Sequence, residues 1–357
     1  MRDRARLTID LDAVVANWRA LADRAPRSEV AAVVKADAYG LGATRVVPAL
    51  ARAGCRTFFT AQTEEAVAVR AAAPEARVLV LHGIAAGDAR EAVARGLVPV
   101  LNEPGQVAVW RDLARTLGRR LAVALHLDTG MNRLGLAAGR AIALDGLVPV
   151  LVMSHLVSAE IADDPLNEAQ RQRFERARAA WPGVPASLAN SSALFLGAPF
   201  HLDLCRPGYA LYGGNPVPGR PNPMRAVIRL DAPVLQVTTI AAAGSVGYNA
   251  TFAVRPGMRI ATVPVGYADG WPRSSGNRAS VRIGGVAVPI AGRVSMDLIT
   301  LDVSHLPEAA VRPGTTVEML GEPDGIEALA QAAGTNGYEI LTRLGRRYER
   351  RYRGGEP

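Results

Sequence analysis

The first two thirds of the chain alternate between short apolar runs and longer amphipathic segments. The apolar runs are rich in Val, Leu and Ala and have the length of buried strands, whereas the segments between them repeat apolar residues at helical spacing. This alternation is typical of parallel sheets covered by helices. The expected strands are 31–34, 57–61, 78–81, 98–101, 121–127, 148–155, 186–189 and 202–205, and the expected helices are 64–73, 89–95, 106–117, 137–143 and 168–180.

The number of expected strands decides the fold class. About eight strands in the first ~200 residues predict a (β/α)8 TIM-type barrel rather than an open dinucleotide-binding sheet. Beyond residue 229, Val-, Thr- and Ile-rich runs broken by Gly and Pro predict a β-rich domain, and the Gly-, Asn- and Pro-rich segment 213–223 separates the two patterns. We therefore expect a barrel domain over 1–225 and a C-terminal β domain over 226–357.

Composition is that of a globular protein, with 49% hydrophobic and 21% charged residues among 357. The longest apolar run, 147–153, is too short to span a membrane, and the charged N-terminus has no secretion signal. Two cysteines far apart in sequence, Cys55 and Cys205, indicate a reducing compartment and provide no metal-binding pair. We expect a cytoplasmic protein without a membrane segment or a metal.

The formal net charge of +8 raises the question of an anionic partner. Six arginines lie within 343–353, where a nucleic-acid-binding tail, a solvated strand face and a phosphate contact are alternatives. Tyr348 and Tyr352 interrupt the cluster, and no Lys or Gly-Ser run accompanies it, which favours the strand. We expect no nucleic-acid partner.

Lys35 follows the apolar run 31–34 and precedes a loop-like segment that contains Gly40 and Gly42, which permit unusual backbone angles. A buried ammonium group without a partner is costly, so such a lysine either extends its charged end to solvent or forms an imine with a carbonyl ligand. Taken alone, the position of Lys35 favours extension of its charged end to solvent. The residues at the other strand ends decide between this interpretation and an imine-forming lysine.

Polar residues also stand at the ends of four other expected strands. Catalytic groups of a barrel gather at the carboxyl-terminal ends of its strands, so these side chains are predicted to share one site with Lys35. A second interpretation is open for three of these positions. His155 fits a hydrogen-bonded core histidine, Asn190 with Ser191 fits a helix N-cap, and Arg206 fits an ion pair with Asp203. The residues are Asp128, His155, Asn190 with Ser191, and Arg206.

The combination of these groups suggests a cofactor. Lys35 can form an imine, Ser191 and the main-chain N–H groups around Gly208 can hold a phosphate, and Arg206 can face a ring nitrogen. An imine-forming lysine, a phosphate seat and a partner for a pyridine nitrogen together describe a pyridoxal phosphate site.

Six motifs, in the same order along nearly the whole chain, resemble the alanine racemase family. Several independent motifs in register are more specific than any one of them. The motifs are VKADAYG at 34–40, DTGMNRLG at 128–135, RPGYALYG at 206–213, SVGY at 245–248, GYADG at 266–270 and GRVSMD at 292–297.

This resemblance implies interconversion of L- and D-alanine, for D-alanine biosynthesis, by a homodimer with shared sites. Lys35 matches the lysine that holds the cofactor and serves as one base, and Tyr248 matches the opposite base, donated by the partner subunit. Two bases on opposite faces are needed because each enantiomer loses its proton on its own side. Without the resemblance, Tyr248 reads as a loop tyrosine.

The other roles are also implied by the resemblance. Arg206 matches the donor to the pyridine nitrogen. Because a guanidinium group is always charged, it does not give up its proton to the ring, which makes the ring a weaker electron sink. Arg206 and His155 are also expected to help Tyr248 ionise. Tyr267 and Met296 also have plainer interpretations, as part of a tight turn and as core filler. The remaining matches are Tyr39, Asn190, Ser191, Gly208 and Tyr209 for the cofactor, and Arg133, Tyr267, Met296 and Asp297 for the substrate.

Three positions depart from the family pattern. His126 replaces a lysine that orients the arginine matching Arg133, and a histidine can accept a hydrogen bond from Arg133 only when neutral. Leu41 replaces a histidine, and Arg346 replaces a phosphate-contacting tyrosine. These departures leave open a racemase of broader specificity, for example toward serine or lysine, or a decarboxylase of the same fold type.

Overall fold

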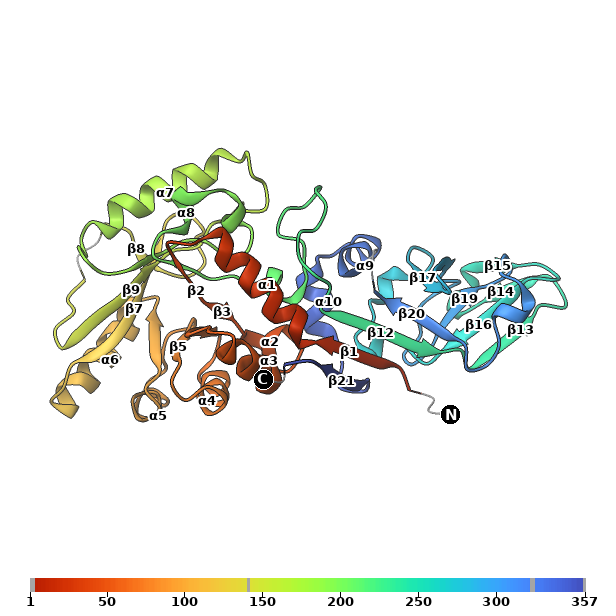
Figure 1. The fold of residues 1–357 in the computed structure, drawn as a ribbon, viewed down its shortest axis with the longest axis horizontal. Coiled ribbons are helices and arrows are strands. Elements are labelled where there is room, and N and C mark those ends of the chain that lie inside the picture. The colour runs from red at the N-terminus through yellow and green to blue at the C-terminus, as the bar shows by residue number, and fades with distance from the viewer. Residues whose placement is uncertain (1–3, 140–141, 322–324, 356–357) are drawn as a thin grey trace. The chain divides into compact units, whose positions relative to one another are not determined.

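The computed structural model describes residues 4–139, 142–321 and 325–355 and divides into two compact units (Figure 1). The barrel unit comprises Asp12–Arg225, and the β unit combines the N-terminal residues up to Leu11 with Ala226–Gly354. The first residues of the chain therefore belong with the C-terminal unit, although the sequence pattern placed them in the barrel. The reason is that β1 (Arg6–Asp10) pairs with two strands of the β unit.

The barrel unit is built on parallel strands that follow one another in chain order. The run β3-β4-β5-β6-β7-β9-β10 is continuous, and β8 (Leu136–Ala137) pairs with β7 outside it. Every residue of β4 and β6 is buried, as expected for strands covered on both faces. The strands are β2 (Glu29–Val30), β3 (Ala32–Val33), β4 (Thr57–Thr60), β5 (Arg77–Val80), β6 (Val98–Leu101), β7 (Leu121–Asp128), β9 (Leu147–Met153), β10 (Ala186–Ser187) and β11 (Leu204–Cys205).

Backbone hydrogen bonds around β11 close the barrel. On one side β11 pairs with β2, and on the other the Arg206 N–H donates to the Ala189 carbonyl at 2.8 Å. With β2 and β3 as two parts of one strand, the described residues form the predicted (β/α)8 barrel. Its helices are α1 (Leu11–Arg24), α2 (Lys35–Tyr39), α3 (Ala43–Arg52), α4 (Thr63–Ala72), α5 (Ala89–Ala94), α6 (Pro104–Leu117), α7 (Pro165–Arg178) and α8 (Ala198–His201).

The expected helix over 137–143 is wrong for the part of it that the structure describes. Ala137 belongs to β8, Gly139 has a φ of +84°, and residues 142 and 143 have no regular structure. Residues 140 and 141 lie outside the described residues. A left-handed glycine next to a strand pairing interrupts a helical backbone.

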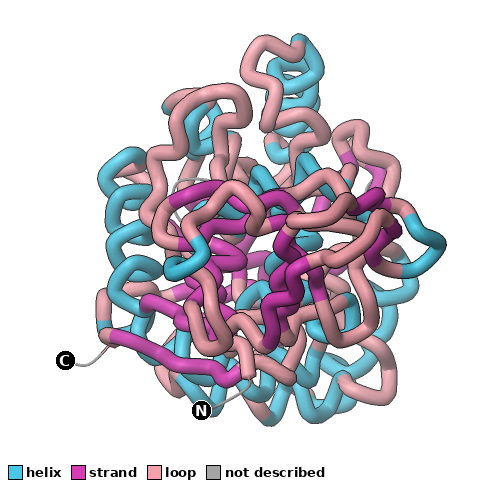
Figure 2. The backbone as a smooth tube through the Cα atoms, turned by 90° about the vertical axis from the view of Figure 1, so that its right-hand side faces the viewer, coloured by secondary structure: helices cyan, strands magenta, loops and turns pink. Residues whose placement is uncertain are grey.

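The β unit contains a six-stranded sheet in the order β18-β17-β20-β12-β1-β21, a three-stranded sheet β13-β16-β19 and the hairpin β14-β15. Figure 2 shows the backbone of the whole chain with its strands, helices and loops distinguished by colour. Its elements are β12 (Ile228–Pro233), β13 (Gln236–Thr239), β14 (Gly244–Val246), β15 (Phe252–Val254), β16 (Arg259–Val263), β17 (Ser280–Ile283), β18 (Val286–Pro289), β19 (Ile299–Asp302), β20 (Thr316–Leu320), α9 (Gly325–Ala333), α10 (Gly337–Arg343) and β21 (Glu349–Arg353).

The C-terminal arginine cluster ends in the strand β21, parallel to β1. Several of its guanidinium groups are neutralised within the β unit: Arg351 pairs with Glu349 at 2.9 Å, and Arg343 pairs with Glu339 at 2.7 Å. The interpretation of this segment as a strand is thus confirmed for 349–353. Among the helices of the described residues, none combines the length and the apolar character needed to cross a membrane.

Candidate active site

Lys35 begins α2, directly after β3, at the carboxyl-terminal end of the barrel strands. The four residues that follow, 36–39, have φ values of +52° to +55°, so they form a left-handed turn without a glycine. For L-amino acids this conformation costs about 1–2 kcal/mol per residue, and it persists only where the surroundings impose it. The unusual backbone angles predicted at Gly40 and Gly42 are confirmed, with φ values of +83° and +94°, but the turn at 36–39 was not predicted. Such strain is concentrated at functional sites.

Lys35 is the only lysine in the sequence, since arginine supplies every other residue of the 41 Lys and Arg. Its side chain is half-buried, and burial together with the positive charge of Arg133 lowers its pKa, while Glu65 opposes this shift. A lower pKa increases the fraction of neutral amine, which is the nucleophilic form. The electrostatics therefore favour a reactive lysine.

A buried cradle lies at the start of the 3-10 turn 209–212. The Ser191 Oγ accepts hydrogen bonds from the N–H groups of Gly208 at 3.0 Å and Ala210 at 3.2 Å. Because both bonds use the oxygen, the Ser191 hydroxyl hydrogen remains available to an anion. Beside it, the Tyr39 and Tyr212 rings lie 4.8 Å apart between centroids. The structure thus brings together Ser191, Gly208 and Tyr39, as the phosphate hypothesis requires.

Gly208→Ala is expected to destabilise this cradle. A Cβ at residue 208 would lie 2.3 Å from the Tyr39 Oη and 2.9 Å from the Tyr39 Cζ, and Tyr39 is held in a buried stack. We expect a loss of about 1–3 kcal/mol in the free energy of unfolding, measured by urea denaturation, because overpacked cores cost that much. Gly87→Ala is the control, since nothing lies within 4 Å of its Cβ position. Equal stability of the two variants would contradict the close contact.

Asn190 shows the local role that its sequence neighbours suggested. Its Oδ1 accepts a hydrogen bond from the Ala193 N–H at 2.9 Å, at the start of the 3-10 turn 193–195. This cap fixes the loop that carries Ser191. The contact supports a positioning role for Asn190.

Arg206 lies buried without a carboxylate partner among the residues that the structure describes. Its guanidinium donates to the Ser154 carbonyl at 2.7 Å and to the Ser187 Oγ. The ion pair with Asp203 is wrong, because the Asp203 carboxylate instead accepts from the Ala186 N–H at 2.8 Å. Burial lowers the Arg206 pKa to about 10, so the group stays charged at neutral pH. A buried cation with only neutral partners has unused capacity to bind a polar acceptor.

His155 is uncharged at neutral pH. Burial and the nearby charges of Arg206 and Arg133 lower its pKa to about 3. Its carbonyl accepts a hydrogen bond from the Gln170 side chain at 3.0 Å. His155 can therefore act on a neighbouring group through hydrogen bonding or packing, but not as a cation.

The tautomer of His126 follows from its partner. The Asn102 amide nitrogen donates to the Leu81 and Val100 carbonyls at 2.9 and 2.8 Å, so the Asn102 Oδ1 faces the His126 Nδ1 at 2.7 Å. Nδ1 must carry the hydrogen, and Nε2 is left as an acceptor. Burial, followed by the charge of Arg206, lowers the His126 pKa to about 4. His126 is thus neutral, which is the state in which it can accept from Arg133.

His126→Ala is expected to lower kcat/KM by roughly tenfold or more, because it removes the neutral acceptor available to Arg133, and hydrogen bonds to charged groups contribute about 1.5–3 kcal/mol. Steady-state kinetics measures this. Unchanged affinity and turnover would mean that His126 does not influence Arg133.

Asp128 holds the loop that carries Arg133. Its Oδ1 accepts from the N–H groups of Gly130 and Met131 at 2.9 and 3.0 Å. Arg133 itself is exposed, whereas Leu41, the second departure from the family pattern, is fully buried. Asp128 therefore has a structural role that its position at a strand end did not distinguish from a catalytic one.

The β unit brings three of the recognised motifs together. The Ala268 N–H donates to the Met296 carbonyl at 2.9 Å, and a Cβ at Gly292 would lie 2.9 Å from the Val246 carbonyl oxygen, two residues before Tyr248. Tyr248 is 66% exposed and Met296 is 53% exposed, so the interpretation of Met296 as core filler is wrong.

The loop at Asp297 is tied down by charge. Arg347 pairs with Asp297 at 2.7 Å and with Asp269 at 3.1 Å. Tyr267, in the 3-10 turn 267–269, lies next to this network and is 40% exposed. Arg346 is exposed in the same segment of chain. The predicted substrate-side residues therefore lie on accessible loops with a fixed backbone.

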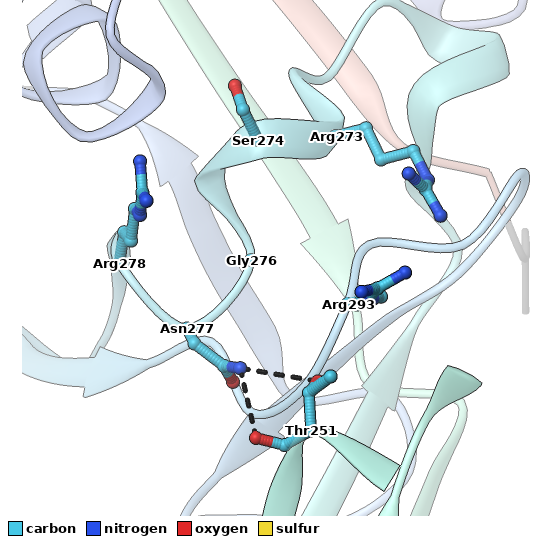
Figure 3. A pocket seen from close by; sticks show the side chains of 7 residues that line it. All are labelled: Thr251, Arg273, Ser274, Gly276, Asn277, Arg278 and Arg293. Carbon is cyan, nitrogen blue, oxygen red and sulfur yellow. Dashed lines mark hydrogen bonds between the residues drawn. The ribbon is translucent and has the colours of Figure 1, made fainter. Parts of the chain in front are cut away.

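A pocket of about 480 Å³ in the β unit is lined by three arginines, Arg273, Arg278 and Arg293 (Figure 3). No ion pair neutralises these three guanidinium groups within the described parts of the chain. Asn277 and Thr251 also line this pocket, and the Asn277 amide nitrogen donates to the Thr251 carbonyl and hydroxyl oxygens at 3.3 Å (Figure 3). The pocket has a positive potential that favours small anions such as carboxylates.

Comparisons with known proteins agree with this architecture. Residues 9–216 match the family model "Alanine racemase, N-terminal domain", and residues 227–352 match "Alanine racemase, C-terminal domain". The chain therefore belongs to the alanine racemase family, as its motifs predicted. Alanine racemases of Methylobacterium nodulans and Rhodospirillum rubrum are each 51% identical to it, with 98% and 99% of this chain and 96% and 97% of theirs covered.

Solved structures give the same result for the fold. The alanine racemase of Bartonella henselae, with covalently bound pyridoxal phosphate, superposes with a TM-score of 0.93 at 38% identity, covering 98% of this chain and 100% of that chain. The biosynthetic alanine racemase of Pseudomonas aeruginosa superposes with a TM-score of 0.92 at 36% identity, covering 99% and 100%. The predicted barrel followed by a β domain is confirmed.

Proposed function

We propose that this protein is a pyridoxal-phosphate-dependent racemase that interconverts L- and D-alanine. The observation that carries the proposal is the half-buried Lys35, with its lowered pKa, presented by a strained turn at the mouth of the barrel. Family membership, the names of the relatives and the cofactor in the Bartonella henselae structure support the same function.

The side chains of the barrel unit fit this cofactor. The Lys35 amine suits its aldehyde, and the Arg206 guanidinium suits its ring nitrogen. The Ser191 hydroxyl hydrogen suits its phosphate, with the Gly208 N–H holding the Ser191 oxygen in place. When bound, the cofactor supplies stabilisation for the negative charge that develops at the substrate Cα. Arg206 stays protonated at neutral pH, so it would hold the ring nitrogen by donating a hydrogen bond without transferring its proton.

Two residues would move the proton. Lys35 Nζ exchanges a proton at one face of the substrate Cα, and Tyr248 Oη does so at the other. Arg133, Met296 and Asp297 would bind the substrate, with Tyr267 at the entryway. The test is racemisation by the purified protein with added pyridoxal phosphate, comparing alanine with serine and lysine. Faster turnover of serine or lysine than of alanine would identify a racemase of different specificity.

We further propose that Tyr248 serves the site of a partner subunit in a homodimer. The phenol of Tyr248 is 66% exposed, and the exposed apolar side chains of Tyr267, Met296 and Leu298 belong to the same unit. Exposed apolar side chains of this size are typical of surfaces that a partner covers.

The buried, free thiols of Cys55 and Cys205 support a reducing, cytoplasmic location. Supply of D-alanine for biosynthesis is the role that we propose there.

Subunit mixing tests the shared site. In a heterodimer of Lys35→Ala and Tyr248→Phe chains, one site combines the intact Lys35 of one chain with the intact Tyr248 of the other, and the second site carries both defects. After random exchange of equal amounts, about half of the dimers are mixed, so we expect about a quarter of the wild-type activity from two inactive proteins. No recovery of activity after confirmed exchange would show that each site uses its own Tyr248.

A further inference from the structure

Glu65 connects three segments at the mouth of the barrel unit. One carboxylate oxygen, Oε1, accepts a hydrogen bond from the Ala36 N–H at 2.7 Å. The other, Oε2, accepts from the N–H groups of Ala61 at 2.8 Å and Gln62 at 3.3 Å. Gln62 and Glu65 also form the capping box of α4. Since main-chain donors engage both oxygens, the Glu65 side chain has a defined orientation.

The contact with Ala36 falls where the backbone is strained. Ala36 is the first residue of the left-handed turn, and its N–H belongs to the peptide bond that joins it to Lys35. The orientation of this peptide unit sets the direction of the Lys35 side chain. The next residue of the turn is also held, because the Asp37 Oδ1 accepts from the Ala43 N–H at the start of α3 at 2.7 Å. Two carboxylates therefore brace the turn, and the one that contacts the peptide unit of Lys35 is Glu65.

We propose that Glu65 is a positioning residue, which holds the left-handed turn 36–39 and thereby fixes the direction and reach of Lys35. Without it, the first left-handed residue loses its charged acceptor and the turn can relax toward ordinary backbone angles. The negative charge of Glu65 also opposes the lowering of the Lys35 pKa by burial and Arg133. The consequence for catalysis rests on the proposed function, whereas the consequence for the turn does not.

Three variants separate these effects. Glu65→Ala removes both acceptors. Glu65→Gln retains one carbonyl oxygen, which can accept from Ala36 or from the α4 N-terminus but not from both. Glu64→Gln is the matched control, because Glu64 is an exposed neighbour in the same first turn of α4.

Two measurements on the full chain test the proposal. The first is amide hydrogen exchange of the peptide that spans 36–41 in the cofactor-free protein. The second is the rate at which pyridoxal phosphate becomes trapped on the protein by borohydride. This second signal is specific, because Lys35 and the N-terminal amine are the primary amines of the sequence.

For Glu65→Ala we expect roughly tenfold faster exchange in 36–41 and roughly tenfold slower trapping, with smaller changes in Glu65→Gln and none in Glu64→Gln. If Glu65→Ala does not fold, Glu65→Gln decides the result alone. Wild-type exchange and trapping in the folded Glu65 variants would overturn the proposal. Absence of trapping in the wild type would overturn the proposed function instead, and the exchange experiment would still test whether Glu65 holds the turn.

Discussion

Lys35→Ala is expected to lower kcat/KM for racemisation of either alanine enantiomer by more than roughly 1,000-fold, because it removes both the covalent anchor of the cofactor and one of the two bases. No other lysine exists in the sequence to substitute for it. The measurement is chiral chromatography of alanine incubated with enzyme and saturating pyridoxal phosphate.

Lys35→Arg distinguishes charge from chemistry. This variant keeps a cation at the end of β3 but has no amine that can bond to an aldehyde, so we expect it to be as inactive as Lys35→Ala. The chain can be checked for folding by its thermal unfolding temperature. Substantial activity of either variant would contradict the assignment of Lys35.

Tyr248→Phe is expected to lower kcat/KM by roughly 100- to 10,000-fold, the range over which a positioned acid or base contributes. The loss must be the same for L- and D-alanine, because the two enantiomers have equal free energies in water and the ratio of their kcat/KM values is fixed by the equilibrium constant. Separate initial-rate measurements from each enantiomer test this.

Tyr338→Phe is the matched control for Tyr248→Phe, since Tyr338 lies in α10 of the same unit and outside the recognised motifs. We expect it to retain wild-type rates. Full activity of Tyr248→Phe would reject Tyr248 as the opposing base, and a loss in one direction only would point to an error in the assay or in enzyme stability.

The barrel was predictable because its strands are buried on both faces. Segments such as 78–81 and 98–101 therefore read as continuous apolar runs, and β5 and β6 follow them closely. The alternation failed at 137–143, where a short strand pairing and a left-handed glycine replace the helix. The place of β1 was also not predictable, because its partners β12 and β21 lie more than 200 residues away in the sequence.

The site was predictable in its chemistry but not in its geometry. Strand-end positions indicated Lys35 and Arg206 as site residues. Only the structure showed that the Arg206 guanidinium is buried and bonded to neutral groups. The left-handed turn went unnoticed because Ala and Asp do not signal positive φ values, and Glu65 went unnoticed because its contact with Ala36 spans 29 residues. The spacing of Gln62 and Glu65, which is typical of a capping box at a helix start, is the one sequence signal that could have indicated Glu65.

The central claim is that Lys35 forms the covalent bond to the cofactor, and reductive trapping tests it most directly. The protein is mixed with pyridoxal phosphate, reduced with borohydride and digested, and the modified peptide is identified by mass spectrometry. We predict a single reduced adduct on the Nζ of Lys35, which is lost in Lys35→Ala. An adduct confined to the N-terminal amine, or no adduct at all, would contradict the account.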